Sequence, residues 1–239
     1  AFVGLLVWRF MKLDEQVEHK ILLEKISLPQ LRQVLALRSV WLLMVLILCA
    51  YVGYKITDVF SLYAQDVMGY DQVDSAQVGT FLLFIRPVAG ILIGILADRT
   101  DGALLLLLSF IVTVAGSLLF ATGILEGAAT FLFFLSILIV AAGVYAARAL
   151  YFAVMRQGRI PLVLTGTAVG LISIIGYTPD IFAGPAMGYL LDEFPGPEGH
   201  RLVFWMLAGF SGVGTLAAWT YYKRYRIRKA PQEPTESSK

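Results

Sequence analysis

"ALLLLLSFIVTVAGSLLFATGIL", residues 103–125, contains no charged side chain. A helix rises about 1.5 Å per residue, so a stretch of this length crosses the roughly 30 Å hydrocarbon core of a bilayer. Water does not reach the backbone at that depth, and the stretch is too long and too continuously apolar for the alternating strands of an outer-membrane barrel. It therefore predicts a transmembrane helix.

Five further apolar stretches of similar length accompany it, in a chain that is 58% hydrophobic and 15% charged, with a mean hydropathy of +0.76. This composition is far more apolar than that of an average soluble domain. We predict an all-α polytopic membrane protein whose six-helix bundle is formed by residues 39–65, 76–97, 103–125, 128–155, 162–190 and 202–222.

Basic residues are concentrated in alternate connections between these spans. Fifteen of the 19 Lys and Arg residues lie in segments 9–38, 99–102, 156–161 and 223–239. The other connections hold one basic residue, Arg201, against seven acidic residues. Cytoplasmic loops of membrane proteins carry an excess of Lys and Arg, so we predict that both ends of the bundle are cytoplasmic.

The chain divides into four parts by composition. Residues 1–8 are apolar but too few to cross a bilayer, so we interpret them as the end of a truncated transmembrane helix. Residues 9–38 are charged and are interpreted as a cytoplasmic linker between two bundles. Residues 39–222 form the predicted six-helix bundle, and residues 223–239 a basic cytoplasmic tail. This layout is the one expected of the second half of a twelve-helix transporter.

Ionisable residues inside the apolar spans are the main candidates for function. A charge at the bilayer centre costs about 2.5 to 3.5 kcal/mol on insertion scales, so such residues usually face a bundle interior or a water-filled path. Arg86 lies about 17 Å from either end of its span, beyond what its side chain can bridge. The residues predicted to bind substrate or couple transport are Tyr51, Lys55, Asp58, Arg86, Arg148 and Asp180.

The stretch "AYVGYKITDVFSLY", residues 50–63, places its polar side chains on one helix face. Lys55 and Asp58 are three residues apart, so on a continuous helix they neutralise each other. Two interpretations stay open: a pair that a substrate or a proton breaks, or a permanent salt bridge that fixes helix packing.

Small residues and prolines mark the spans as well. Glycines four residues apart let helix backbones approach closely, which we expect at Gly90 and Gly94, Gly166 and Gly170, and Gly184 and Gly188. Pro179 and Pro185 remove backbone donors, so the span that contains them is expected to bend or open where it lines a cavity.

The sequence "GILADRTDG", residues 94–102, resembles the inter-helix loop signature of the major facilitator superfamily through Gly94, Asp98 and Arg99. The match is partial, because Gly102 falls one residue late and no basic pair follows it. The resemblance implies that these three residues form a conformational latch between neighbouring helices. A helix cap with a cytoplasmic arginine is the simpler alternative.

A second stretch, "GTAVGLISIIGYTPDIFAGPAMGYLLD", residues 166–192, is similar to the eleventh helix of the sugar-phosphate permease branch, the organophosphate antiporters. The residues on which the resemblance rests are Gly166, Thr167, Ala168, Gly170, Gly176 and Tyr177. It implies secondary active transport by alternating access in the bacterial inner membrane. The implied partners are the missing N-terminal six-helix half of the same transporter, a small polar, anionic solute, and a coupling proton or ion.

The resemblance does not fix which small anionic solute is the substrate. Where the family has a phosphate-binding arginine five residues before an aspartate, this sequence has Gly53, and the basic group is Lys55. A lysine lacks the planar fork that suits phosphate, so a sugar acid or a carboxylate is as compatible as a sugar phosphate.

Two other functions were weighed. A transporter-like receptor that senses the solute without moving it is the alternative function. An intramembrane protease is suggested by "GFSG", residues 209–212, but Ser211 has no histidine base in a neighbouring span, and we expect no enzyme activity. The sequence contains no His or Cys cluster and no nucleotide motif, so no metal or cofactor is expected.

Overall fold

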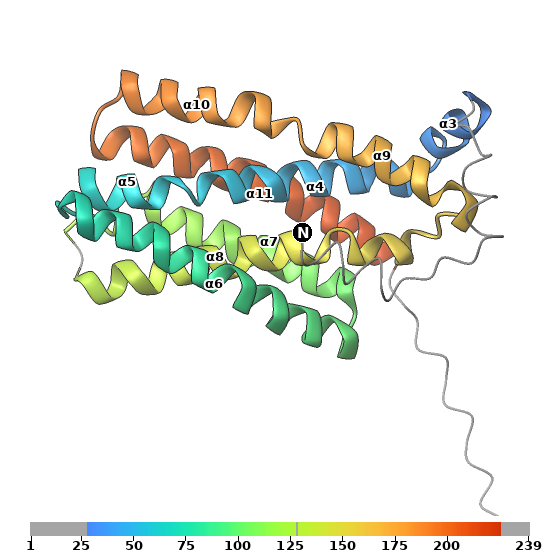
Figure 1. Ribbon diagram of the computed structural model, residues 1–239, viewed down its shortest axis with the longest axis horizontal. Helices are drawn as coiled ribbons and strands as arrows, with labels where there is room; N and C mark the ends of the chain where they lie inside the picture. Colours follow the sequence, from blue (N-terminus) through green and yellow to red (C-terminus); the bar gives the residue numbers. More distant parts are fainter. Residues whose placement is uncertain (1–27, 128, 226–239) are drawn as a thin grey trace, which may run out of the picture.

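The computed structural model describes residues 28–127 and 129–225 (Figure 1). The predicted segment 1–8, most of the predicted linker and the end of the predicted tail lie outside the described residues. The described helices are α3 (Leu28–Leu35), α4 (Arg38–Ile56), α5 (Val59–Asp66), α6 (Gln72–Arg99), α7 (Gly102–Ala121), α8 (Thr130–Leu150), η1 (Ala153–Gly158), η2 (Leu162–Leu164), α9 (Thr165–Gly176), α10 (Pro179–Glu193) and α11 (Pro197–Tyr225).

Six helical segments in the described part of the chain are long and apolar enough to cross a membrane, which confirms the predicted all-α six-helix architecture. They are residues 38–66, 72–99, 102–121, 130–150, 162–193 and 197–225. Four predicted boundaries differ from the structure by four or five residues. The third span ends at Ala121 in a run of turns, and the fourth ends at Leu150 before the short helix η1, because apolar turns and apolar helix are alike in hydropathy. The second and sixth spans begin earlier than predicted, at Gln72 and Pro197, because their first turns contain polar residues.

Two of the six spans are interrupted rather than continuous. The first span breaks between α4 and α5, and the fifth breaks between α9 and α10 at Tyr177 and Thr178, just before Pro179. At each break a threonine hydroxyl donates to a backbone carbonyl: Thr57 to Tyr54 at 2.7 Å, and Thr178 to Ile175 at 2.7 Å. Each of these carbonyls also accepts from the backbone N–H of the same threonine, at 3.3 and 3.2 Å, so the hydroxyl adds a second hydrogen bond at each break. The break before Pro179 confirms the predicted opening of that span, whereas α10 continues through Pro185.

The connections sort to two ends of the bundle, as the charge pattern requires. Gln157 of η1 lies 3.4 Å from the Asp101 carboxylate at the start of α7, so the two predicted cytoplasmic connections meet at one end. At the other end, the α7–α8 connection meets the start of α11 through the Glu126–Arg201 ion pair. In Figure 1 the first of these ends also carries α3, and the second carries α5 and the start of α11.

Helix α7 packs between α8 and α11 through glycines, but not through the glycines that the sequence suggested. A Cβ at Gly143 would lie 2.9 Å from the backbone carbonyl of Ser109 and 2.9 Å from the backbone nitrogen of Thr113. A Cβ at Gly116 would lie 2.7 Å from Val140. The predicted close approach at Gly90, Gly94, Gly166, Gly170, Gly184 and Gly188 is wrong within the described residues, where each has open space around its Cβ position. Spacing alone does not say which face of a helix meets its neighbour.

We predict that Gly143→Ala lowers the thermal stability of the full-length protein in detergent, because the new methyl group meets backbone atoms that cannot move aside. Overpacking of this kind costs about 1 to 3 kcal/mol. Gly90→Ala is the matched control, with the same added group in a helix interior and no atom within 4 Å. Equal unfolding temperatures for the two variants would contradict the packing described here.

Candidate solute-binding site

Lys55 and Asp180 form an ion pair that joins α4 to α10. Lys55 Nζ lies 2.8 Å from Asp180 Oδ1. The Tyr51 hydroxyl, one turn before Lys55, lies 3.1 and 3.0 Å from the two carboxylate oxygens and donates to them. The Lys55 and Asp180 side chains are 31% and 49% exposed, so the pair lies open on one side of the bundle. The structure thus brings Asp180 together with Tyr51 and Lys55, which the sequence predicted on one face of another span.

The predicted pair of Lys55 with Asp58 was wrong. The helix does not continue through Asp58, because α4 ends at Ile56 and α5 begins at Val59. Asp58 is exposed and forms no ion pair with another residue in the described ranges. The i, i+3 argument failed because it assumed a continuous helix across the break.

The ends of the interrupted helices stabilise the charged side chains that lie there. Lys55 lies in the last turn of α4, where the helix dipole is negative, and Asp180 lies in the first turn of α10, where it is positive. Each charge therefore interacts favourably both with its own helix end and with the other side chain. Broken helices whose ends face a midplane site are the usual way in which transporters hold charged solutes and ions.

Arg86 and Arg148 pack on tyrosine rings next to this ion pair. Arg86 Nη1 donates to the Tyr54 hydroxyl at 2.6 Å, and its guanidinium carbon lies 4.6 Å from the Tyr54 ring centroid. The guanidinium carbon of Arg148 lies 3.7 Å from the same centroid and 5.4 Å from that of Tyr51. Arg86 is thus directed from α6 toward α4 and α8, not away from the bundle. Cation–π contacts of this kind stabilise a cation that has left water.

Besides Tyr54, three further tyrosines that were not among the predicted site residues complete the site. The ring centroid of Tyr145, one turn before Arg148, lies 5.4 Å from the guanidinium carbon of Arg86. The Tyr151 and Tyr177 hydroxyls lie 3.3 Å apart, and the Tyr177 ring meets that of Tyr51 edge to face at 4.8 Å. The sequence did carry a signal for two of them, because Tyr145 and Tyr151 lie three residues on either side of the intramembrane Arg148.

The predicted latch residues lie apart from this cluster, at the end of α6. Gly94, Asp98 and Arg99 are all exposed. Neither Asp98 nor Arg99 pairs with another residue for which the structure gives a position. Their role as a latch stays a prediction.

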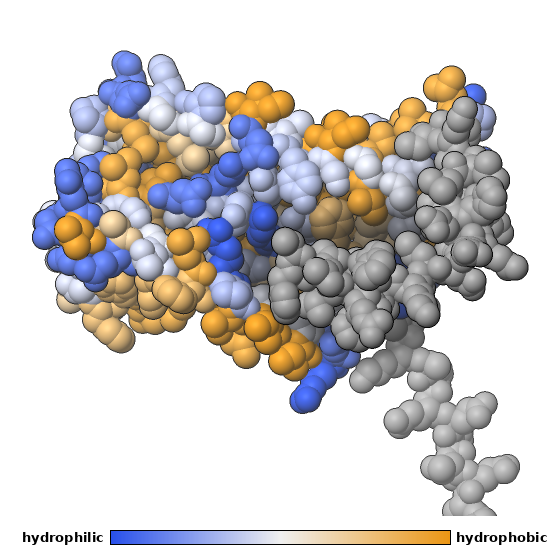
Figure 2. Space-filling model, in the orientation of Figure 1, coloured by the Kyte–Doolittle hydropathy of each residue, from blue (hydrophilic) through white to orange (hydrophobic). Residues whose placement is uncertain are grey.

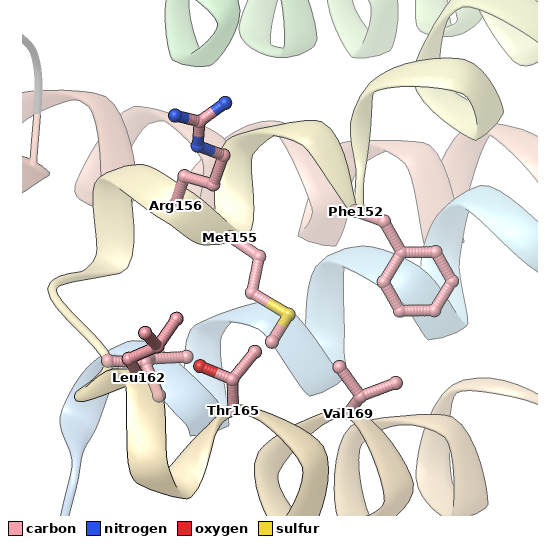
Figure 3. Close-up of a pocket in the computed structure, with 7 residues that line it drawn as sticks. Phe152, Met155, Arg156, Leu162, Thr165 and Val169 are labelled. Carbon is pink, nitrogen blue, oxygen red and sulfur yellow. The ribbon is translucent and has the colours of Figure 1, made fainter. Parts of the chain in front are cut away.

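Two further features were not predicted. At the end of the bundle that carries the α7–α8 connection, buried His200 lies 3.1 Å from Asp66, next to the Arg201–Glu126 pair. At the opposite end a cavity of about 590 Å³ lies between η1 and α9, where Met155 and Phe152 point toward Val169 and Arg156 extends away (Figure 3). No cluster suited to a metal ion occurs among residues 28–127 and 129–225.

The charged and aromatic residues form one polar region in otherwise apolar helices. Figure 2 shows hydrophilic atoms that extend from one end of the molecule to the middle of the drawn face, beside hydrophobic surface. The region combines cations, one carboxylate and several tyrosine hydroxyls, which is the donor and acceptor set that binds small polar molecules.

Six apolar spans around a polar region define an all-α polytopic membrane protein. Two curated proteins of Escherichia coli (strain K12) are similar to the chain. "Inner membrane protein YqcE" is 26% identical over 243 residues, which cover 99% of this chain and 56% of that protein. "Inner membrane protein YihN" is 37% identical over 86 residues, which cover 36% of this chain and 20% of that protein.

No family model and no solved structure matches the chain. The chain spans about half the length of the first relative, 56%, and less of the second. Both relatives are named for the inner membrane, which agrees with the six apolar helices and supports an integral inner-membrane protein.

We predict that Lys55 is energetically coupled to Asp180 more strongly than to Asp58. The Lys55→Gln and Asp180→Asn variants should each lower the unfolding temperature of the full-length protein in detergent, because each leaves one charge unpaired. The double variant should recover part of the loss, which a double-mutant cycle measures.

The matched cycle combines Lys55→Gln with Asp58→Asn and should show a smaller coupling energy, because no ion pair joins these two side chains. Coupling in the Asp58 cycle with none in the Asp180 cycle would show that the two interrupted helices are not joined as described.

Proposed function

We propose that this chain is the C-terminal six-helix half of a major facilitator transporter, and that the complete protein moves a small polar, anionic organic solute by secondary active transport. The solute class comprises sugar acids, carboxylates and sugar phosphates. One observation carries the proposal: a half-exposed Lys55–Asp180 pair joins the ends of two interrupted spans, beside two arginines and several tyrosines.

The cost of charge in a membrane supports this function over a purely structural one. Lys55, Arg86, Arg148 and Asp180 come from four different spans and converge on a single region. A bundle that needed only to be stable could replace such residues with apolar ones, often at no loss. Charged residues inside spans are instead typical of solute and ion paths.

Alternating access would expose the polar region first to one side of the membrane and then to the other. The Lys55–Asp180 contact joins α4 to α10, so its breakage would free the two interrupted helices to move relative to each other. A second six-helix half would supply the other wall of the solute path. The relative that extends well beyond this chain is compatible with such a half.

Transport is tested with the full-length protein in proteoliposomes. We expect uptake of at least one solute from a panel of labelled sugar acids, small carboxylates and sugar phosphates, and no uptake of their neutral analogues. Asp180→Asn should reduce the uptake strongly, because it releases Lys55 and removes the charge that a coupling proton or ion would neutralise.

Gly209→Ala is the control variant, because α11 carries none of the site residues and no atom lies within 4 Å of the added methyl group. Saturable binding without uptake would favour the receptor alternative over transport.

A further inference from the structure

The three cations of the site differ in how their charge is balanced. Lys55 has Asp180 as a partner at 2.8 Å. Arg86 and Arg148 have no carboxylate within salt-bridge distance among the residues that the structure describes. Arg86 Nε and Arg148 Nη1 are also buried without a hydrogen-bond partner in that part of the chain. The two arginines therefore carry the uncompensated positive charge of the region.

We infer that Arg86 and Arg148, both packed on the Tyr54 ring, form the binding site for the oxyanion of an organic solute, and that Lys55 does not. The inference deepens the proposed function, on which it rests for the presence of a solute. It divides the predicted site residues into two groups: an oxyanion site on α6 and α8, and a neutral ion pair between α4 and α10.

The contacts of the arginines suit this role. Arg148 lies 3.7 Å from the Tyr54 centroid, and Arg86 is fixed at the same residue by its hydrogen bond to the hydroxyl. A guanidinium presents its donors as a planar fork, which matches the two oxygens of a carboxylate or a phosphate. Because both guanidinium groups are already held on the Tyr54 ring, less side-chain conformational entropy is lost when an anion binds.

The position of Lys55 argues against it as the oxyanion site. An anion that bound Lys55 would first have to displace Asp180, which also accepts from Tyr51. An anion at the arginines displaces no carboxylate in the described structure and relieves the repulsion between two cations near one ring. Tyr177 is partly exposed and touches the Tyr51 ring beside Arg148, so it is placed to contact the remainder of the solute.

The test measures ligand binding to the full-length protein in detergent, by calorimetry and by the shift in unfolding temperature. The probes are glucuronate and lactate for carboxylates, glucose 6-phosphate and inorganic phosphate for phosphates, and glucose as the neutral control. We expect a carboxylate or a phosphate probe to bind and glucose not to bind. The class of probe that binds more tightly, carboxylate or phosphate, identifies the oxyanion.

Arg86→Gln and Arg148→Gln should each weaken binding of that probe about 10- to 100-fold, the usual effect of losing a hydrogen bond to a charged group. Arg86→Lys and Arg148→Lys keep the charge and should weaken it less, which separates binding from a failure to fold. Arg156→Gln removes the same charge in the cavity of Figure 3, away from the polar region, and should leave affinity within about threefold. The Lys55→Gln/Asp180→Asn double variant should also bind the probe.

Three outcomes would overturn the inference. They are the absence of anion-dependent binding to the unaltered protein, unchanged affinity in both Arg→Gln variants, and loss of binding in the Lys55→Gln/Asp180→Asn variant alone. If the arginines instead pair with carboxylates elsewhere in the full-length protein, both Arg→Gln variants would keep their affinity for the probe. Their unfolding temperatures without ligand would fall. Normal binding without uptake would refute transport but leave the oxyanion site standing.

Discussion

The contact between Lys55 and Asp180 is the constraint around which the polar half of this bundle is arranged. Each charge is costly alone in a membrane-spanning segment, so each stabilises the other, and the pair forms because α4 and α10 lie side by side. The breaks in both spans contribute to the same balance, because they place the negative end of α4 at Lys55 and the positive end of α10 at Asp180. At each break the backbone N–H and the hydroxyl of one threonine, Thr57 or Thr178, both donate to the same carbonyl, which limits the cost of the break. One ion pair thus depends on two irregular backbones, and the irregular backbones are stabilised by the ion pair.

The six spans could be predicted from the sequence because hydropathy is a local property that depends on the residues of the span alone. The partner of Lys55 could not, because Asp180 lies in another span and three-dimensional contact is not local. Local reasoning favoured Asp58 instead, and the break at Thr57 removed the helix that this argument needed. The glycine pairs failed for a similar reason: Gly90 and Gly94 have suitable spacing but open surroundings, whereas Gly143 has no such pair and meets the backbone of α7. Deep charges were found from the sequence, and their contacts were not.

The tyrosines show what a charge-based search omits. Both arginines pack on the ring of Tyr54. Tyr145 on α8 and Tyr177 at the α9–α10 break extend this aromatic surface. A tyrosine has an apolar ring and a polar hydroxyl, so it is inexpensive to place in a span and gives no strong hydropathy signal. Its proximity to an intramembrane arginine is the more useful indicator, because a cation in an apolar environment needs a polarisable or electron-rich neighbour.

The two sides of the bundle satisfy their polar groups in different ways. On α7 the hydroxyls of Ser109 and Thr113 donate to carbonyls of their own helix, at 2.7 and 2.9 Å, so this helix needs no polar partner and packs closely on α8 and α11. On α4, α6, α8 and α10 the charged side chains reach across to other helices. The α7 side is therefore complete within the chain, while the arginines of α6 and α8 retain unused donors. Since an unpaired buried donor is costly, the polar side has the stronger requirement for a further partner, and that requirement is the physical argument for the binding site proposed there.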